Sequence, residues 1–124
     1  MNNDTIPFED SIFINQEARY ILSLLNDDIK SSSWLLTNGI HKIGRLASKE
    51  IILDDVTVSR NHGYISVDDE EIIIVDEGST NGIFVNGEVK TESNLQSGSR
   101  LQIGKYNLII TKVEKKWILE TYLN

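Results

Sequence analysis

The chain carries, between residues 44 and 87, the segments Gly44-Arg45, Ser59-Arg60-Asn61-His62 and Ser79-Thr80-Asn81-Gly82. These segments concentrate arginine, hydroxyl and amide side chains between apolar runs typical of strands. A guanidinium offers a planar fork of N–H donors, and hydroxyls and amides add further donors, so the set suits a phosphate dianion. No acid–base or nucleophile pair accompanies them. The stretch therefore predicts a site that holds a phosphate rather than one that hydrolyses it.

The composition is that of a soluble globular protein, with 40% hydrophobic and 25% charged residues in a chain of 124, which suggests one domain. No apolar run approaches the roughly 20 residues that a membrane-spanning helix needs. The N-terminus lacks the basic and apolar regions of a signal peptide. The absence of cysteine excludes disulfides and thiolate metal sites. We therefore expect a cytoplasmic protein that does not bind membranes.

The net charge of −7 argues against general nucleic-acid binding, which depends on neutralising many phosphates. Residues 41–64 differ from the rest, because they hold four Lys and Arg residues against three Asp and Glu residues. One neutral-to-basic patch on an acidic protein fits a single bound anion and would repel a polyanion. We therefore expect no nucleic-acid partner.

Short apolar runs separated by turn residues recur along the chain, and no segment shows a helix-length period. The expected strands are residues 18–25, 33–37, 40–44, 51–53, 63–67, 71–75, 83–85, 100–103 and 106–113. Asn38-Gly39 and Asn86-Gly87 each follow such a run, and each pair predicts a hairpin turn because both residue types tolerate positive φ. The pattern predicts an all-β fold, an antiparallel β-sandwich of about ten to eleven short strands, with its binding loops at one end.

Three segments are expected in sequence order. Residues 1–17 form a short, acidic segment that contains a proline and differs from the strand-like runs after it, which favours a flexible N-terminal tail. Residues 18–113 form the β-domain, and residues 114–124 form a C-terminal extension. Within that extension, residues 116–123 could add an edge strand or a last helical turn, and periodicity does not decide between the two.

At the level of motifs, the chain resembles a forkhead-associated (FHA) domain, a phosphothreonine-binding β-sandwich with an FHA/SMAD-like fold. The matching pieces are Ile43-Gly44-Arg45, Ser59-Arg60-Asn61-His62, Asp76 with Ser79-Thr80-Asn81-Gly82, Val85-Asn86-Gly87, and Ile103-Gly104. All of them occur in the family's order and spacing, and the resemblance extends over about residues 18–113. One departure is Ile83, where the family usually has threonine, at a position that tends to be structural.

The resemblance implies a role for each matching side chain. Arg45 would clamp the phosphopeptide, Ser59 would donate its hydroxyl to the phosphate, and Arg60 would support the phosphate or the adjacent backbone. Thr80 and Asn81 would hold the peptide main chain, with Asn81 as the chief peptide ligand. The residues expected to be architectural are Gly44, His62, Gly82 and Asn86.

Other interpretations of the polar residues are weaker. His62 follows Ser59 by three positions, so it is expected to bond the loop backbone rather than to act as a base, and His41 is expected to be a strand residue without a special role. The acidic run 68–71 lacks the alternating ligands and glycine of a calcium loop, which favours a solvated hairpin tip. No P-loop or credible Ser-His-Asp set is present. We expect no enzyme activity, no cofactor and no metal.

A narrower resemblance concerns residues 54–62 and 98–106, which are similar to the small actinobacterial FHA regulators of 2-oxoglutarate metabolism. In those proteins a tail threonine, three residues before a phenylalanine, is phosphorylated by a Ser/Thr protein kinase. Thr5 and Phe8 have that spacing here, although the tail is shorter and contains one threonine rather than a pair. The resemblance implies that Thr5 is a candidate phosphosite, that the phosphorylated tail is a ligand of its own domain, and that enzymes of 2-oxoglutarate or glutamate metabolism are partners. The alternative is that Thr5 is an unmodified tail residue.

Two main functions follow from the sequence. The first is a non-enzymatic phosphothreonine-dependent module that binds and regulates partner proteins, in a cytoplasmic Ser/Thr kinase pathway. The alternative is a scaffold β-sandwich that binds unphosphorylated protein surfaces.

Overall fold

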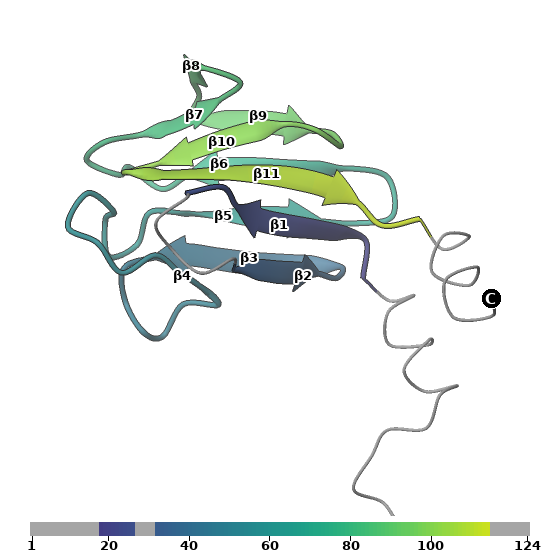
Figure 1. The fold of residues 1–124 in the computed structure, drawn as a ribbon, viewed down its shortest axis with the longest axis horizontal. Coiled ribbons are helices and arrows are strands. Elements are labelled where there is room, and N and C mark those ends of the chain that lie inside the picture. The colour runs from purple at the N-terminus through teal and green to yellow at the C-terminus, as the bar shows by residue number, and fades with distance from the viewer. Residues whose placement is uncertain (1–17, 27–31, 115–124) are drawn as a thin grey trace, which may run out of the picture.

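In the computed structural model, residues 18–26 and 32–114 are described, and they form two β-sheets packed face to face (Figure 1). The strands are β1 Tyr20–Leu24, β2 Ser33–Leu36, β3 Gly39–Gly44, β4 Ile51–Ile52, β5 Gly63–Val67, β6 Ile72–Asp76, β7 Ile83–Val85, β8 Glu88–Val89, β9 Glu92–Leu95, β10 Arg100–Ile103 and β11 Tyr106–Lys112. One sheet has the order β2-β1-β11-β10-β7-β8 and the other has the order β4-β3-β5-β6-β9. The predicted β-sandwich is thus confirmed. The expected segments 1–17 and 116–123 lie outside the described residues.

Alternation of apolar and polar residues along the strands builds the core between the two sheets. β5 and the first four residues of β6 illustrate the pattern, because every second residue is buried while the residues between them are only partly covered. The core consists of Leu22, Leu36, Ile43, Ile51, Leu53, Val58, Ile65, Val67, Ile72, Ile74, Ile83, Val85, Leu95, Leu101, Ile103, Tyr106, Leu108 and Ile110. Val58 belongs to this core although it lies in a loop, so the core also anchors the segment that precedes Ser59.

The two Asn-Gly pairs have different structures. Asn86-Gly87 makes the predicted hairpin, because Val85 faces Glu88 across a two-residue turn in which both residues have positive φ. The hairpin predicted at Asn38-Gly39 is wrong. β2 pairs with β1 whereas β3 pairs with β5 and β4, so the chain crosses here from one sheet to the other.

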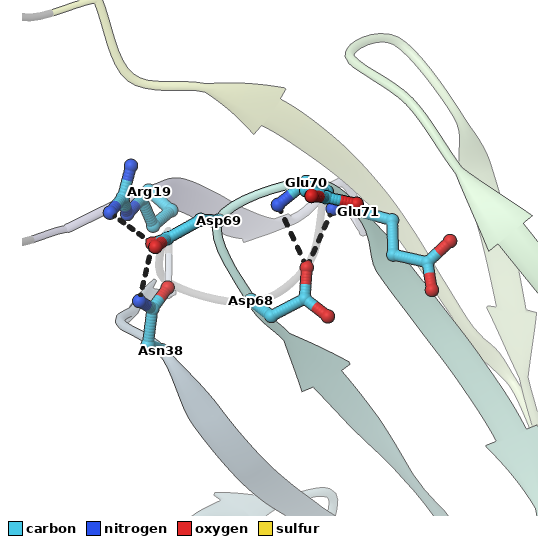
Figure 2. A network of polar contacts seen from close by, with 6 residues as sticks. All are labelled: Arg19, Asn38, Asp68, Asp69, Glu70 and Glu71. Atoms are coloured by element: carbon cyan, nitrogen blue, oxygen red, sulfur yellow. Dashed lines mark hydrogen bonds and ion pairs between the residues drawn. The ribbon is translucent and has the colours of Figure 1, made fainter.

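The crossover is held by a polar network at the turn between β5 and β6 (Figure 2). Asp69 accepts hydrogen bonds from Asn38 Nδ2 at 2.8 Å and from Arg19 Nη2 at 2.6 Å. Asp68 Oδ1 accepts the backbone N–H groups of Glu70 and Glu71, each at 2.8 Å, and these bonds lower the pKa of Asp68 below its ordinary value. The acidic run is therefore the predicted hairpin tip, and the side chain of Asn38 joins it to the crossover.

Two strands, β8 and β9, were not expected from the sequence. β9 reads Glu92-Ser93-Asn94-Leu95, with low β-propensity and a single buried apolar side chain, Leu95. It is an edge strand held by pairing with β6, which no local pattern reveals. β8 is two exposed residues that follow the Asn86-Gly87 turn. The antiparallel prediction also has one exception, because β3 and β4 run parallel.

Candidate functional site

Three loops meet at one end of the sandwich, and they carry the predicted site residues: β3–β4 (residues 45–50), β4–β5 (53–62) and β6–β7 (77–82). The first two project beyond β3 and β5 at the left of Figure 1. Backbone hydrogen bonds join all three, because Arg45 N donates to Ser59 O at 3.1 Å and Glu77 N donates to His62 O at 3.0 Å. Strand ends that are fixed by the core thus bring together segments more than 30 residues apart.

Arg45 extends from the end of β3 into this loop cluster and is partly buried. Its Nε donates to the carbonyl oxygen of Val58 at 3.1 Å, which fixes the orientation of the guanidinium plane. Among the described residues, no carboxylate forms an ion pair with Arg45. The two terminal nitrogens therefore keep their N–H groups for an external anion.

Ser59 and Thr80 lie on different loops and are directly connected. The hydroxyl oxygen of Ser59 accepts the backbone N–H of Thr80 at 3.0 Å. A serine hydroxyl can accept through its lone pairs and still donate its proton, so the proton of Ser59 remains available to a ligand oxygen. The contact places a hydroxyl donor beside the β6–β7 loop, on the same loop end as Arg45.

Asn81, on the β6–β7 loop, makes a second contact between the same two loops. Its Nδ2 donates to the carbonyl oxygen of Thr57 at 2.9 Å, which leaves the second Nδ2 hydrogen and Oδ1 for other partners. An amide with one donor and one acceptor left over matches the C=O and N–H pair of an extended peptide. Asn81 and Thr80 are both exposed, which is consistent with contact to a ligand.

Arg60 follows Ser59 directly and is exposed. Its side chain forms no ion pair with a carboxylate of residues 18–26 or 32–114. The loop end thus presents two arginines whose charge is not neutralised by a close carboxylate there, in a chain of net charge −7. Such a local excess of positive charge attracts an anion to this end of an otherwise acidic protein.

His62 is completely buried and bonds the loop backbone at both ring nitrogens. Nδ1 accepts the N–H of Ser59 at 3.0 Å, so the proton must sit on Nε2, which donates to Gly82 O at 2.8 Å. The imidazole therefore ties the β4–β5 loop to the β6–β7 loop, and it has no nitrogen left to act as a base toward a ligand.

Gly44 is required by a close approach of two backbones. A Cβ added there would lie 2.1 Å from the carbonyl oxygen of Arg60 and 3.2 Å from Cγ of Lys49. The absence of a side chain lets β3 lie directly against the segment that carries Ser59 and Arg60. Gly82 instead has a φ of 78°, a conformation that other residues rarely adopt, and its N–H donates to Ser79 Oγ at 2.9 Å.

Asn86 lies in the β7–β8 turn, outside the three loops and at the end of β7 that is farther from the β6–β7 loop. It has a φ of 49° in the β7–β8 turn, and its Oδ1 accepts the N–H of Arg100 at 2.8 Å. The structure therefore brings together Arg45, Ser59, Arg60, Thr80 and Asn81 with Gly44, His62 and Gly82, and it places Asn86 elsewhere. Thr5 lies outside the described residues.

Two features escaped the sequence interpretation. His41, expected to have no special role, is buried and contacts Glu50 Oε2 at 2.6 Å and Thr37 O at 2.7 Å, so it connects the crossover to the β3–β4 loop. Thr57 binds Asp55, Asn81 and Lys105. The pattern Asp-x-Thr at 55–57 is a local turn signature that could have indicated the first of these contacts.

The described residues contain no group of three or more His, Cys, Asp or Glu side chains suited to hold a metal ion. In the same part of the chain, no helix is long and apolar enough to cross a bilayer.

A β-sandwich that gathers arginine, hydroxyl and amide donors on loops at one end defines a recognition module. A family model described as "Inner membrane component of T3SS, cytoplasmic domain" matches residues 24–114. A solved structure from a structural and functional analysis of phosphothreonine-dependent FHA domain interactions is similar, with a TM-score of 0.72 and 30% identity over 77% of this chain and 98% of that one. The FHA domain of FhaA, in a complex, gives a TM-score of 0.68 and 32% identity over 73% of this chain and 98% of that one. The chain belongs to the forkhead-associated domain family.

Two curated relatives show the same similarity in sequence. The oxoglutarate dehydrogenase inhibitor of Corynebacterium efficiens is 42% identical over 76 residues, which are 61% of this chain and 54% of the relative. The glycogen accumulation regulator GarA of Mycobacterium tuberculosis is 42% identical over 78 residues, 63% of this chain and 48% of the relative. The chain thus spans about half the length of the curated relatives it matches, and their names describe an inhibitor and a regulator.

Proposed function

We propose that this chain is a phosphothreonine-dependent binding module that regulates partner proteins without catalysing a reaction. The observation that carries the proposal is the position of Arg45, whose Nε is held by Val58 O at 3.1 Å while its terminal nitrogens face no carboxylate partner within residues 18–26 and 32–114. An oriented guanidinium with free N–H groups suits phosphate oxygens, because both charge and geometry are already in place.

The neighbouring donors support the same ligand. Ser59 keeps its hydroxyl proton while its oxygen is occupied by Thr80 N, and Arg60 adds a second positive charge. Asn81, anchored on Thr57 O, has the donor and acceptor that a peptide main chain requires. Phosphothreonine supplies about −1.5 to −2 charge and three acceptor oxygens, which these groups complement.

The test is a titration by fluorescence anisotropy with a peptide of residues 1–14, phosphorylated at Thr5 or left unmodified. The wild type should bind the phosphorylated peptide only. Arg45→Ala should weaken binding by about 1.5–3 kcal/mol, which is roughly ten- to hundredfold. Arg100→Ala is the matched control, because it removes the same charge at an exposed residue in β10, outside the three loops that carry the candidate site.

Two results would contradict the proposal. Equal binding of the phosphorylated and unmodified peptides would favour the scaffold β-sandwich that recognises unphosphorylated surfaces. Unchanged binding by Arg45→Ala would remove Arg45 from the site. Circular dichroism of each variant checks that the fold is retained.

We further propose cytoplasmic partners among the enzymes of 2-oxoglutarate or glutamate metabolism. The support is the 42% identity with proteins named oxoglutarate dehydrogenase inhibitor and glycogen accumulation regulator. Affinity purification from a lysate, with wild-type protein and with Arg45→Ala in parallel, tests this. Partners that bind the wild type only and are enzymes of this class support it, whereas recovery of unrelated proteins alone contradicts it.

Thr5 is the proposed regulatory phosphosite, used by a Ser/Thr protein kinase. Ala18 precedes β1 at the end of the sandwich that faces away from the recognition loops, so a bound tail has to run along the sheets. Strands of up to seven residues span about 23 Å. The thirteen-residue separation between Thr5 and Ala18 reaches roughly 45 Å when extended, so the phosphothreonine can reach Arg45.

A tethered phosphothreonine would occupy the site intramolecularly, because short linkers give effective concentrations in the millimolar range. Phosphorylation would then displace partners. NMR spectra before and after phosphorylation of Thr5 test this switch. Shifts at Arg45, Ser59 and Asn81 that do not change on dilution support it. Unchanged signals at these residues, together with unchanged affinity for an added phosphopeptide, contradict it.

A further inference from the structure

Thr57 is the point at which three loops of the recognition end are joined. Its hydroxyl donates to Asp55 Oδ2 at 2.5 Å and accepts the backbone N–H of Lys105 at 2.9 Å. Its own N–H donates to Asp55 Oδ2 at 2.9 Å, and its carbonyl oxygen accepts Asn81 Nδ2 at 2.9 Å. All polar groups of Thr57 are thus used, and they connect the β4–β5 loop to the β6–β7 loop and to the β10–β11 turn.

The β10–β11 turn is shaped to receive Thr57. Gly104 has a φ of 56°, and a Cβ added there would lie 2.4 Å from Thr57 Oγ1 and 2.9 Å from Thr57 O. Glycine therefore allows the turn to lie directly against the loop. Lys105 contributes a second contact, because its Nζ lies 3.3 Å from Asp55 Oδ1.

In the proposed function, Asp55 and Thr57 do not contact the ligand. They lie next to the groups that hold the ligand-binding side chains in place. Asn81 is held through Thr57 O, and Arg45 is held through the carbonyl of Val58, the next residue. Ser59 follows one residue later. Displacement of Thr57 would therefore move the groups that anchor Arg45 and Asn81 at the same time.

We propose that Asp55 and Thr57, locked onto Gly104-Lys105, are positioning residues that hold the recognition loop in its binding conformation before the ligand arrives. This inference rests on the proposed phosphothreonine binding. Its physical basis is preorganisation, because a loop that is already ordered loses less conformational entropy when it binds. Val56 lies between these two positioning residues and is 90% exposed. The contacts of Asp55 and Thr57 therefore order the loop while the Val56 side chain stays open to solvent or ligand.

The first test compares Thr57→Val, which removes the hydroxyl at nearly constant volume, with Thr57→Ser, which restores it. Affinity for the Thr5-phosphorylated peptide should fall roughly five- to twentyfold in Thr57→Val, because two hydrogen bonds that order the loop are lost. Thr57→Ser should bind within about twofold of wild type by the same reasoning. Thr111→Val is the matched control, because Thr111 is exposed and lies near the end of β11 that is farther from Gly104-Lys105.

A second pair of variants separates the loss of the Asp55 contacts from the loss of one negative charge. Asp55→Asn weakens the contacts to Thr57 and Lys105, whereas Asp54→Asn removes the same charge at an exposed neighbour for which no hydrogen bond is seen in the described part of the chain. Asp55→Asn should weaken phosphopeptide binding severalfold, and Asp54→Asn should leave it unchanged or slightly improved. If Thr57→Val does not fold, this pair still tests whether the contacts of Asp55 position the recognition loop.

Hydrogen exchange supplies a readout that is independent of binding. The backbone N–H of Lys105 should be protected in wild type and Thr57→Ser and should exchange at least tenfold faster in Thr57→Val, at temperatures where both are folded. Equal affinity of folded Thr57→Val and wild type would overturn the inference, as would equal losses in Thr57→Val and Thr57→Ser. If wild type does not bind the phosphopeptide at all, the proposed function fails and the positioning role fails with it. A protected Lys105 amide would then mark Thr57 as a structural residue only.

Discussion

Replacement of Gly44 by alanine separates two opposing physical effects at the centre of the site. Gly44 lies in β3 without the positive φ that favours glycine, so backbone entropy alone predicts that alanine would stabilise the fold by about 0.4–1 kcal/mol. The packing predicts the opposite, because the new Cβ would lie 2.1 Å from the carbonyl oxygen of Arg60.

The size of the packing effect follows from the groups that must separate. A normal contact of about 3.5 Å requires β3 and the Arg60 backbone to move apart by more than 1 Å. That movement strains two hydrogen bonds, Arg45 N to Ser59 O at 3.1 Å and His62 N to Ile43 O at 3.0 Å. Overpacking costs about 1–3 kcal/mol and each weakened bond about 0.5–1.5 kcal/mol, so the net loss, after the entropic gain is subtracted, is about 1–5 kcal/mol. The packing term outweighs the entropy term.

Thermal unfolding followed by circular dichroism measures this prediction. At roughly 4 °C per kcal/mol, Gly44→Ala should lower Tm by about 4–20 °C. Gly87→Ala is the control, because Gly87 has a φ of 87° and no atom within 4 Å of the added Cβ, so it reports the conformational cost alone, about 1 kcal/mol. A Gly44→Ala protein with a Tm equal to or above that of wild type would refute the reasoning.

Three further predictions concern charge, architecture and selectivity. Hydrogen bonds from the side chain and backbone of Thr57 lower the pKa of Asp55 below its ordinary 3.8, so the ionised carboxylate stabilises the fold above about pH 4 and loses this effect as pH falls through the lowered pKa. The Tm difference between wild type and Asp55→Asn should therefore be present at pH 7 and shrink as the pH falls below the ordinary pKa of 3.8, in melts across that range. Asn86→Ala, at a φ of 49°, should cost about 2 kcal/mol by denaturant titration and leave phosphopeptide affinity unchanged, because the β7–β8 turn lies outside the three loops that carry the candidate site. Matched peptides should show phosphothreonine binding about fourfold tighter than phosphoserine, as one buried methyl contributes about 0.8 kcal/mol, and equal affinities would argue against a methyl pocket.

The sequence by itself determined the fold class and supplied the set of candidate site residues. Short apolar runs with turn residues between them predicted the strands, and Asn86-Gly87 predicted its hairpin, because these signals depend on neighbours along the chain. The grouping of Arg45 with Ser59, Thr80 and Asn81 came from motif spacing in a family resemblance, and the loops that carry them do meet.

Only the tertiary structure decided which strands pair and which side chains meet when they lie far apart in the sequence. Asn38-Gly39 has the local chemistry of a hairpin, but the two strands that flank it find their partners in different sheets. Pairing with β6 makes β9 a strand despite its polar sequence. The contact of buried His41 with Glu50 and the contacts of Thr57 with Asn81 and Lys105 join residues up to 48 positions apart. Periodicity and turn chemistry report local preferences, whereas these contacts exist because the core holds both sheets in one arrangement and thereby fixes which loops lie together.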